Sequence, residues 1–127
     1  MMLKSEVILQ TGMFDERFFM YCEEVDWAWR IHHTGWDVIC VPSAHVTHIG
    51  GQSSSQIRPQ SIINLWKSRL LLFEKHYSWP RNVFARTMIQ AGIRSKLRQL
   101  SHMTTLSIED RTSLAGAYNT ILEMASR

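Results

Sequence analysis

Residues 12–36 read GMFDERFFMYCEEVDWAWRIHHTGW, and this stretch combines acidic, basic and aromatic residues more closely than its surroundings. From Glu23 to Thr34 the acidic side chains come first and the basic ones last, with Gly35 just beyond. That order complements the helix dipole, and glycine readily adopts the left-handed conformation that ends a helix. We therefore predict a helix over 23–34, preceded by a packed loop.

The sequence on either side of this helix predicts a short helix before it and two strands after it. Residues 5–11 form an apolar helical cluster that Gly12 ends. The segment 36–41 is short and rich in β-branched side chains, which predicts a strand. The segment 44–49 is a second predicted extended segment, and a loop with two glycines and three serines follows it. A two-stranded ribbon is only marginally stable by itself. The ribbon must pack on the helices, pair with another chain or belong to a larger sheet.

The second half of the chain predicts three helices. Residues 61–77 carry apolar side chains at three- and four-residue steps, with Pro59 near the first turn. A second, basic helix is expected over 80–100. The last is expected to begin at Ser107, whose hydroxyl can cap the amide near Asp110.

The composition favours one globular core, and the N-terminal part of the chain is acidic whereas the C-terminal part is basic. The chain has 127 residues, of which 45% are hydrophobic and 20% charged. Residues 1–57 hold three Lys/Arg against seven Asp/Glu, whereas 58–127 hold eleven against four. The acidic front suits general-base chemistry or cation binding. The basic back suits a phospholipid surface, a phosphate-linked substrate or nucleic acid, or is simply a solvated helical face.

The chain shows no apolar run long enough to cross a bilayer and no secretory signal at its start. We therefore expect it in the cytoplasm, with Cys22 and Cys40 as reduced, buried thiols. No nucleic-acid fold signature accompanies the basic helices, so we do not expect nucleic acid as a partner.

Three ordered segments, 12–30, 34–36 and 41–53, resemble the second half of a family-two glycosyltransferase of the rhamnosyltransferase-like kind. The resemblance implies an α/β fold, the C-terminal part of a GT-A nucleotide-diphospho-sugar transferase in which a short β-ribbon packs with helices. Residues 1–57 would then be the acceptor side of the catalytic domain, and 58–127 a basic helical extension. The family's nucleotide-binding half and its Asp-x-Asp motif have no counterpart here, so we do not expect turnover by this chain alone.

The resemblance also implies an activity: inverting transfer of a sugar from a nucleotide-sugar donor to a hydroxyl acceptor, in cell-envelope polysaccharide synthesis at the inner face of the cell membrane. Such a transfer needs a carboxylate base and a divalent cation, Mg²⁺ or Mn²⁺, that offsets charge on the departing diphosphate. The base falls on Glu24, beside Glu23, and the metal-binding histidine on His48. Here the pair reads Glu-Glu where the family has Glu-Asp. A loop near the donor phosphates would include Gly50, Gly51 and Ser53.

Other residues of the predicted helix have supporting roles. Asp26 and Arg30 stand four apart, a spacing that favours an ion pair, and we assign them to support or acceptor binding. Trp27 is assigned the same role, although a tryptophan at helical spacing is more often part of a core. Acidic residues at a helix start also occur for purely electrostatic reasons.

Two functions outside sugar transfer compete with this interpretation. The helices over 60–77 and 80–100 favour a non-enzymatic module that binds a partner protein or lies on acidic lipid. His45, His48 and the acid pair favour a small zinc-binding domain, but residues three apart on a strand face opposite sides. An open ribbon edge also favours a homodimer.

Overall fold

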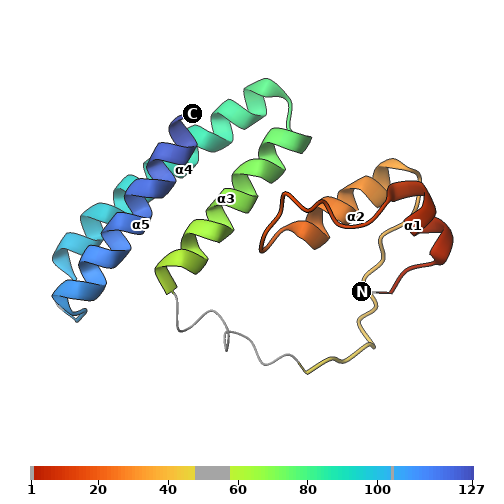
Figure 1. Ribbon diagram of the computed structural model, residues 1–127, viewed down its shortest axis with the longest axis horizontal. Helices are drawn as coiled ribbons and strands as arrows, with labels where there is room; N and C mark the ends of the chain where they lie inside the picture. Colours follow the sequence, from red (N-terminus) through yellow and green to blue (C-terminus); the bar gives the residue numbers. More distant parts are fainter. Residues whose placement is uncertain (1, 48–57, 104) are drawn as a thin grey trace.

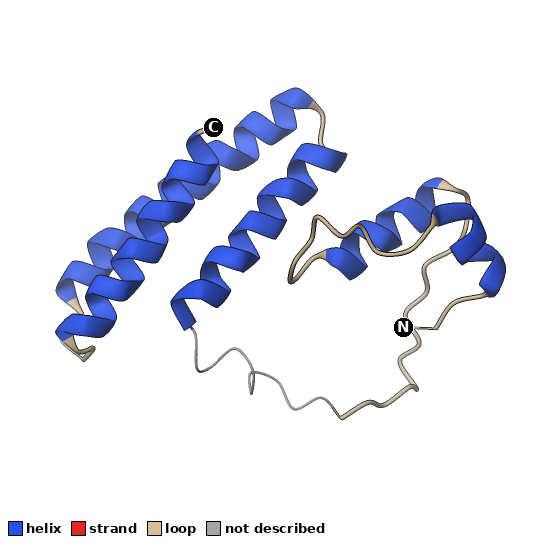
Figure 2. Ribbon diagram, in the orientation of Figure 1, coloured by secondary structure: helices blue, strands red, loops and turns tan. Residues whose placement is uncertain are grey.

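The computed structural model describes residues 2–47, 58–103 and 105–127, and within them it is a helical protein without a β-strand (Figures 1 and 2). Its elements are α1 (Ser5–Thr11), α2 (Glu23–His33), α3 (Arg58–His76), α4 (Trp79–His102) and α5 (Ile108–Ser126). Figure 1 shows α3, α4 and α5 packed side by side, with α2 lying beside the end of α3 that joins α4 and α1 on the far side of α2.

The two N-terminal helices end where the sequence predicts. The amide of Gly12 donates to Ile8 O at 2.9 Å and closes α1, with φ 70° at the glycine. In α2 the acidic residues occupy the first turn and the basic ones the last, and Gly35 follows with φ 88°. Positive φ favours glycine because it has no Cβ. These local signals therefore set both helix ends.

The three C-terminal helices are also confirmed. A break at Tyr77 and Ser78 separates α3 from α4, and Pro80 lies in the first turn of α4, where its missing amide proton costs nothing. The Ser107 hydroxyl accepts the amide of Asp110 at 3.0 Å and caps α5.

The main core lies where α3, α4 and α5 meet. Ile93 is 1% exposed, and Ile121 is fully buried. Long polar side chains close the end of this core: Arg86 donates to Met124 O at 3.0 Å, and Gln90 to Ala125 O at 3.1 Å. These bonds satisfy carbonyls that the last turn of α5 leaves without a helical partner. The buried members of the core are Leu70, Ile89, Ile93, Ile121 and Ala125.

A smaller core joins α1 to α2. Val7, Trp27 and Ile31 are buried together, with Ile8 and Trp36 packed against them. The Trp27 indole donates to the Thr11 hydroxyl at 3.0 Å and to Gly12 O at 2.9 Å. Trp27 is thus a core residue with its one polar group satisfied.

The predicted α/β fold with a β-ribbon is wrong for the described residues. Residues 36–47, which include the first predicted strand, follow an irregular path; the end of the second predicted strand lies outside the described residues. Strands need a neighbour to receive their backbone hydrogen bonds, and this segment has none among the described residues. Its apolar side chains are left exposed, from 55% at Val38 to 85% at Val46. Cys40 is a free thiol, as predicted, but it is exposed rather than buried.

None of the helices in the described parts of the chain is both long and apolar enough to span a membrane.

Candidate functional site

The acid pair opens α2. Glu24 is exposed, whereas Glu23 is half-buried, and its Oε2 is buried without a hydrogen-bond partner among the described residues. Both carboxylates lie in the first turn, where the helix dipole favours negative charge. The pair therefore presents one solvent-accessible carboxylate and one that is held inside.

The turn before the acid pair has an unusual backbone. Tyr21 and Cys22 both have positive φ, 70° and 67°, in a backbone region that residues other than glycine rarely adopt. Each such residue costs about 1–3 kcal/mol, and such residues cluster at functional sites. The strained turn fixes the direction in which the chain enters α2 and hence the position of Glu23.

Arg69 of α3 lies close enough to this turn to affect its electrostatics. Burial raises the pKa of the Cys22 thiol, the charge of Glu24 raises it further, and the Arg69 guanidinium opposes both. The acid pair and Arg69, from distant parts of the sequence, thus act on the same thiol.

Asp26 is the centre of a buried ion cluster that joins α2 to α3. Its side chain is fully buried, and Arg30 Nε lies 2.9 Å from Oδ2, which confirms the predicted pair. Lys75 Nζ and His76 Nε2 each lie 2.7 Å from Oδ1. Burial raises the pKa of Asp26, but hydrogen bonds from Lys75, His76 and Arg30 outweigh burial and lower it overall. Asp26 is therefore held in its ionised form, where it links α2 to α3.

The loop between α1 and α2 is fastened to α3 by the same lysine and one serine. Lys75 Nζ also lies 2.8 Å from Asp15 Oδ2, and the Arg17 guanidinium donates to both oxygens of that carboxylate. The Ser68 hydroxyl donates to Met20 O at 2.7 Å. These bonds hold the loop that leads to the acid pair against one helix.

Arg30 also holds the end of α1. Its guanidinium donates to Thr11 O and to Met13 O, the latter at 2.7 Å. A single side chain therefore links the ion cluster to the segment that follows α1.

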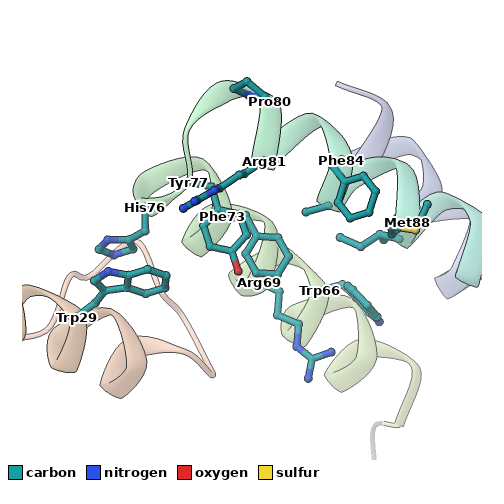
Figure 3. A pocket seen from close by; sticks show the side chains of 12 residues that line it. Trp29, Trp66, Arg69, Phe73, His76, Tyr77, Pro80, Arg81, Phe84 and Met88 are labelled. Atoms are coloured by element: carbon teal, nitrogen blue, oxygen red, sulfur yellow. The ribbon is translucent and has the colours of Figure 1, made fainter.

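A groove of about 810 Å³ opens beside this cluster, between α2, α3 and α4 (Figure 3). Trp29 stacks on His76 with ring centroids 4.6 Å apart, and Phe73 stacks on Tyr77 at 4.8 Å. We call this cavity the aromatic groove; it is lined by Trp29, Trp66, Arg69, Phe73, His76, Tyr77, Pro80, Arg81, Phe84, Ala85, Met88 and Ile89. Aromatic faces with two arginines suit a ligand that combines apolar or sugar surfaces with anionic groups.

The predicted metal and loop residues cannot be placed. His48, Gly50, Gly51 and Ser53 lie outside the described residues, and His45 is exposed. Within the described ranges no group of three or more His, Cys, Asp or Glu side chains is arranged to hold a metal ion.

Sequence reasoning missed the α3 half of the site. Lys75 and His76 lie about fifty residues from Asp26 along the chain, so no local pattern connects them. The sequence does contain one relevant signal, which is that two basic side chains lie together in the last turn of α3.

Comparison with known proteins supports a relationship to the glycosyltransferases. No family model matches the chain, and no solved structure matches it. Two curated proteins, from the CDC 1551 / Oshkosh and ATCC 25618 / H37Rv strains of Mycobacterium tuberculosis, are each named N-acetylglucosaminyl-diphospho-decaprenol L-rhamnosyltransferase. Each is 32% identical over 108 residues, which cover 84% of this chain and 34% of the relative. The chain thus spans about a third of the length of these relatives.

Proposed function

We propose that this chain is the acceptor-side part of an inverting glycosyltransferase, which transfers a sugar from a nucleotide-sugar donor to a hydroxyl of an acceptor. The observation that carries the proposal is the 32% identity to a rhamnosyltransferase over 84% of the chain. The strained turn, the acid pair and the aromatic groove supply groups of the kind that such a transfer needs.

Glu24 is proposed as the general base. Its carboxylate takes the proton from the acceptor hydroxyl while that oxygen bonds to the anomeric carbon and the nucleoside diphosphate leaves with the electrons of the broken bond. Glu24 is the exposed member of the pair and can meet an acceptor, whereas Glu23 is partly enclosed. Glu23 is proposed to position the turn. Asp26, which is fully bonded to cations, is proposed as support.

The aromatic groove is proposed as the acceptor site. The acceptor in the name of these relatives combines an N-acetylglucosaminyl group, a diphosphate and a polyprenol. The ring faces of Trp29 and Tyr77 suit sugar or isoprenoid surfaces, and Arg69 and Arg81 suit the diphosphate. Arg69 also lies within electrostatic range of the strained turn that leads to the acid pair.

A divalent cation and its ligand His48 remain part of the proposal by family resemblance. The described residues do not by themselves form a metal site, so no step above depends on a metal.

The test is a transfer assay on the natural protein that carries this sequence, with nucleotide-activated L-rhamnose as donor and N-acetylglucosaminyl diphosphoryl polyprenol as acceptor. We expect a rhamnosylated lipid whose new bond has the anomeric configuration opposite to that of the donor. Retained configuration would contradict the single displacement with Glu24 as base. Absence of transfer, with this donor and with other nucleotide sugars, would contradict the function.

A further inference from the structure

The aromatic groove continues into a second, smaller hollow where α3 and α4 lie side by side. This hollow has a volume of about 300 Å³, and its lining is almost entirely apolar. Trp66, Met88 and Ile89 line both hollows, so the two adjoin. We call the smaller hollow the seam pocket; it is lined by Trp66, Met88, Ile89, Gly92, Ile93 and Lys96.

One stripe of α4 runs along both hollows. Successive helical residues turn by about 100°, which places Arg81, Met88 and Gly92 within roughly 40° of one another around the helix axis. Lys96 follows one turn beyond Gly92. At a rise of 1.5 Å per residue, the stripe from Arg81 to Lys96 is about 22 Å long. The groove and the seam pocket thus form a long, narrow trough, a shape that suits an extended ligand.

Gly92 lies in the middle of the 24-residue helix α4, where glycine is less favourable than alanine because ordering its backbone costs more entropy. Its backbone does not call for glycine, because among the described residues the glycines with positive φ are Gly12 and Gly35. Close packing does not call for it either, since a Cβ there would have no neighbouring group of the described residues within 4 Å. The missing side chain does have one effect, which is to leave the seam pocket open.

The two ends of the trough differ in character. Arg69 and Arg81 line the aromatic groove but not the seam pocket, and no Asp or Glu of the described residues lines either hollow. Guanidinium groups bind phosphate oxygens through charge-assisted hydrogen bonds. In the seam pocket Lys96 is the one charged residue, and a lysine can line an apolar surface with its stem while its ammonium group stays in water.

We propose that the seam pocket is a tail subsite, which takes the single hydrocarbon tail of a ligand whose anionic head lies against Arg69 and Arg81. The inference deepens the proposed function and rests on it, because a lipid-linked diphosphate acceptor has such a head and tail. Gly92 admits the tail, since a larger side chain there would project into the pocket. The tail gains binding free energy by covering apolar surface such as that of Met88, which is 50% exposed.

The test is isothermal titration calorimetry of the full 127-residue chain with geranyl, farnesyl and geranylgeranyl diphosphate. These probes share one head and differ in tail length, and each is used below the concentration at which it forms micelles. We expect affinity to rise along the series, by about tenfold or more from the first to the last, because each buried methylene group adds to binding.

A matched pair of glycine variants tests the seam pocket itself. Gly92→Leu should weaken geranylgeranyl diphosphate binding about tenfold and change geranyl diphosphate binding by less than about twofold, because only the longer tail reaches the pocket. The control is Gly116→Leu in α5. Gly116 is also a helical, exposed glycine whose Cβ would have no described neighbour within 4 Å, but it lines neither hollow. The control should bind every probe as the parent does. Circular dichroism checks that both variants are folded.

Two further measurements separate the head from the tail and one source of tail from another. Arg81→Gln should weaken all three diphosphates by a similar factor, because it removes a contact with the shared head. Hexadecyl phosphate supplies an unbranched tail. Weakening of its binding by Gly92→Leu would support a subsite for any single hydrocarbon tail, and weakening confined to the diphosphate series would support one for isoprenoid tails.

Three results would overturn the proposal. The first is affinity that does not rise with tail length, or no binding of any probe. The second is an equal effect of Gly92→Leu and Gly116→Leu on geranylgeranyl diphosphate. The third is a dimer of the parent chain in light scattering that Gly92→Leu dissociates, which would assign the seam pocket to a second copy.

The tail subsite and the proposed function fail in different assays. Tail-length dependence that Gly92→Leu removes, in a protein that transfers no sugar, would contradict the function and support the subsite. Sugar transfer to a lipid-linked acceptor by a protein whose binding ignores Gly92→Leu would contradict the subsite and support the function.

Discussion

Replacing Asp26 by Asn should destabilise the protein more than any exposed charge substitution. Asp26 is fully buried, and Arg30, Lys75 and His76 surround its carboxylate. Removing one partner of a buried ion pair typically costs about 3–5 kcal/mol. Lys75 keeps its contact with Asp15, and the Arg30 and Lys75 side chains are 23% and 22% exposed, so water relieves part of the loss. We expect a loss of roughly 2–4 kcal/mol.

The measurement is urea unfolding followed by both far-ultraviolet circular dichroism and tryptophan fluorescence. Two probes are needed because the α1–α2 part, which has its own small core, could unfold before the main core. Three tryptophans lie in α2 or just after it, so fluorescence is sensitive to that part, whereas circular dichroism reports on all the helices. The control is Glu123→Gln, which removes the acidic member of the exposed i,i+4 pair with Arg127. That pair repeats the spacing of Asp26 and Arg30 at the surface, and its loss should change stability by about 0.5 kcal/mol or less.

Equal effects of Asp26→Asn and Glu123→Gln on both probes would contradict this prediction. Such a result would mean that the buried cluster contributes no more than a surface pair does. A loss seen only by fluorescence would instead localise the cluster's contribution to the α1–α2 part.

Three further predictions follow from single features. Acid should unfold the chain. Hydrogen bonds from Arg17 and Lys75 lower the pKa of Asp15, and the pKa of Asp26 is lowered as well. The stability that these two ionised carboxylates contribute above about pH 4 is therefore lost as pH falls through their folded-state pKa values. An acid titration of the circular dichroism signal checks this, and it should be shallower in Asp26→Asn. Cys22→Gly should be more stable than Cys22→Ala by about 1 kcal/mol in urea unfolding, because φ is 67° there; the reverse order would contradict the left-handed turn. Ser107→Ala should lower stability by about 1 kcal/mol through loss of the cap, whereas Ser107→Asp should largely retain it.

The helices could be predicted from the sequence because their signals are local. Gly12 ends α1, Pro80 lies in the first turn of α4, and Ser107 caps α5, each through atoms within four residues. The strands failed for the opposite reason. Residues 36–41 have β-branched side chains, but a strand forms only when a second strand, often distant in sequence, supplies the matching hydrogen bonds.

The candidate site, like the fold, could be predicted only where its contacts are local in sequence. The pair of Asp26 with Arg30 was predictable because four residues of helix place them together. The contacts of Asp26 with Lys75 and His76 and the stacking of Trp29 on His76 depend on how α2 packs against α3. No periodicity within one segment encodes that packing. The groove, which is built from three helices, was therefore beyond sequence reasoning.

The most direct test of the account is the turnover number of Glu24→Gln in the natural protein, compared with Glu16→Gln, which alters another exposed glutamate outside α2. We predict that Glu24→Gln lowers kcat by about 10²–10⁴-fold, the usual contribution of a general base, while donor binding and the activity of Glu16→Gln stay near the parent values. Turnover of Glu24→Gln close to that of the parent would contradict the assignment of the base and, with it, the proposed mechanism.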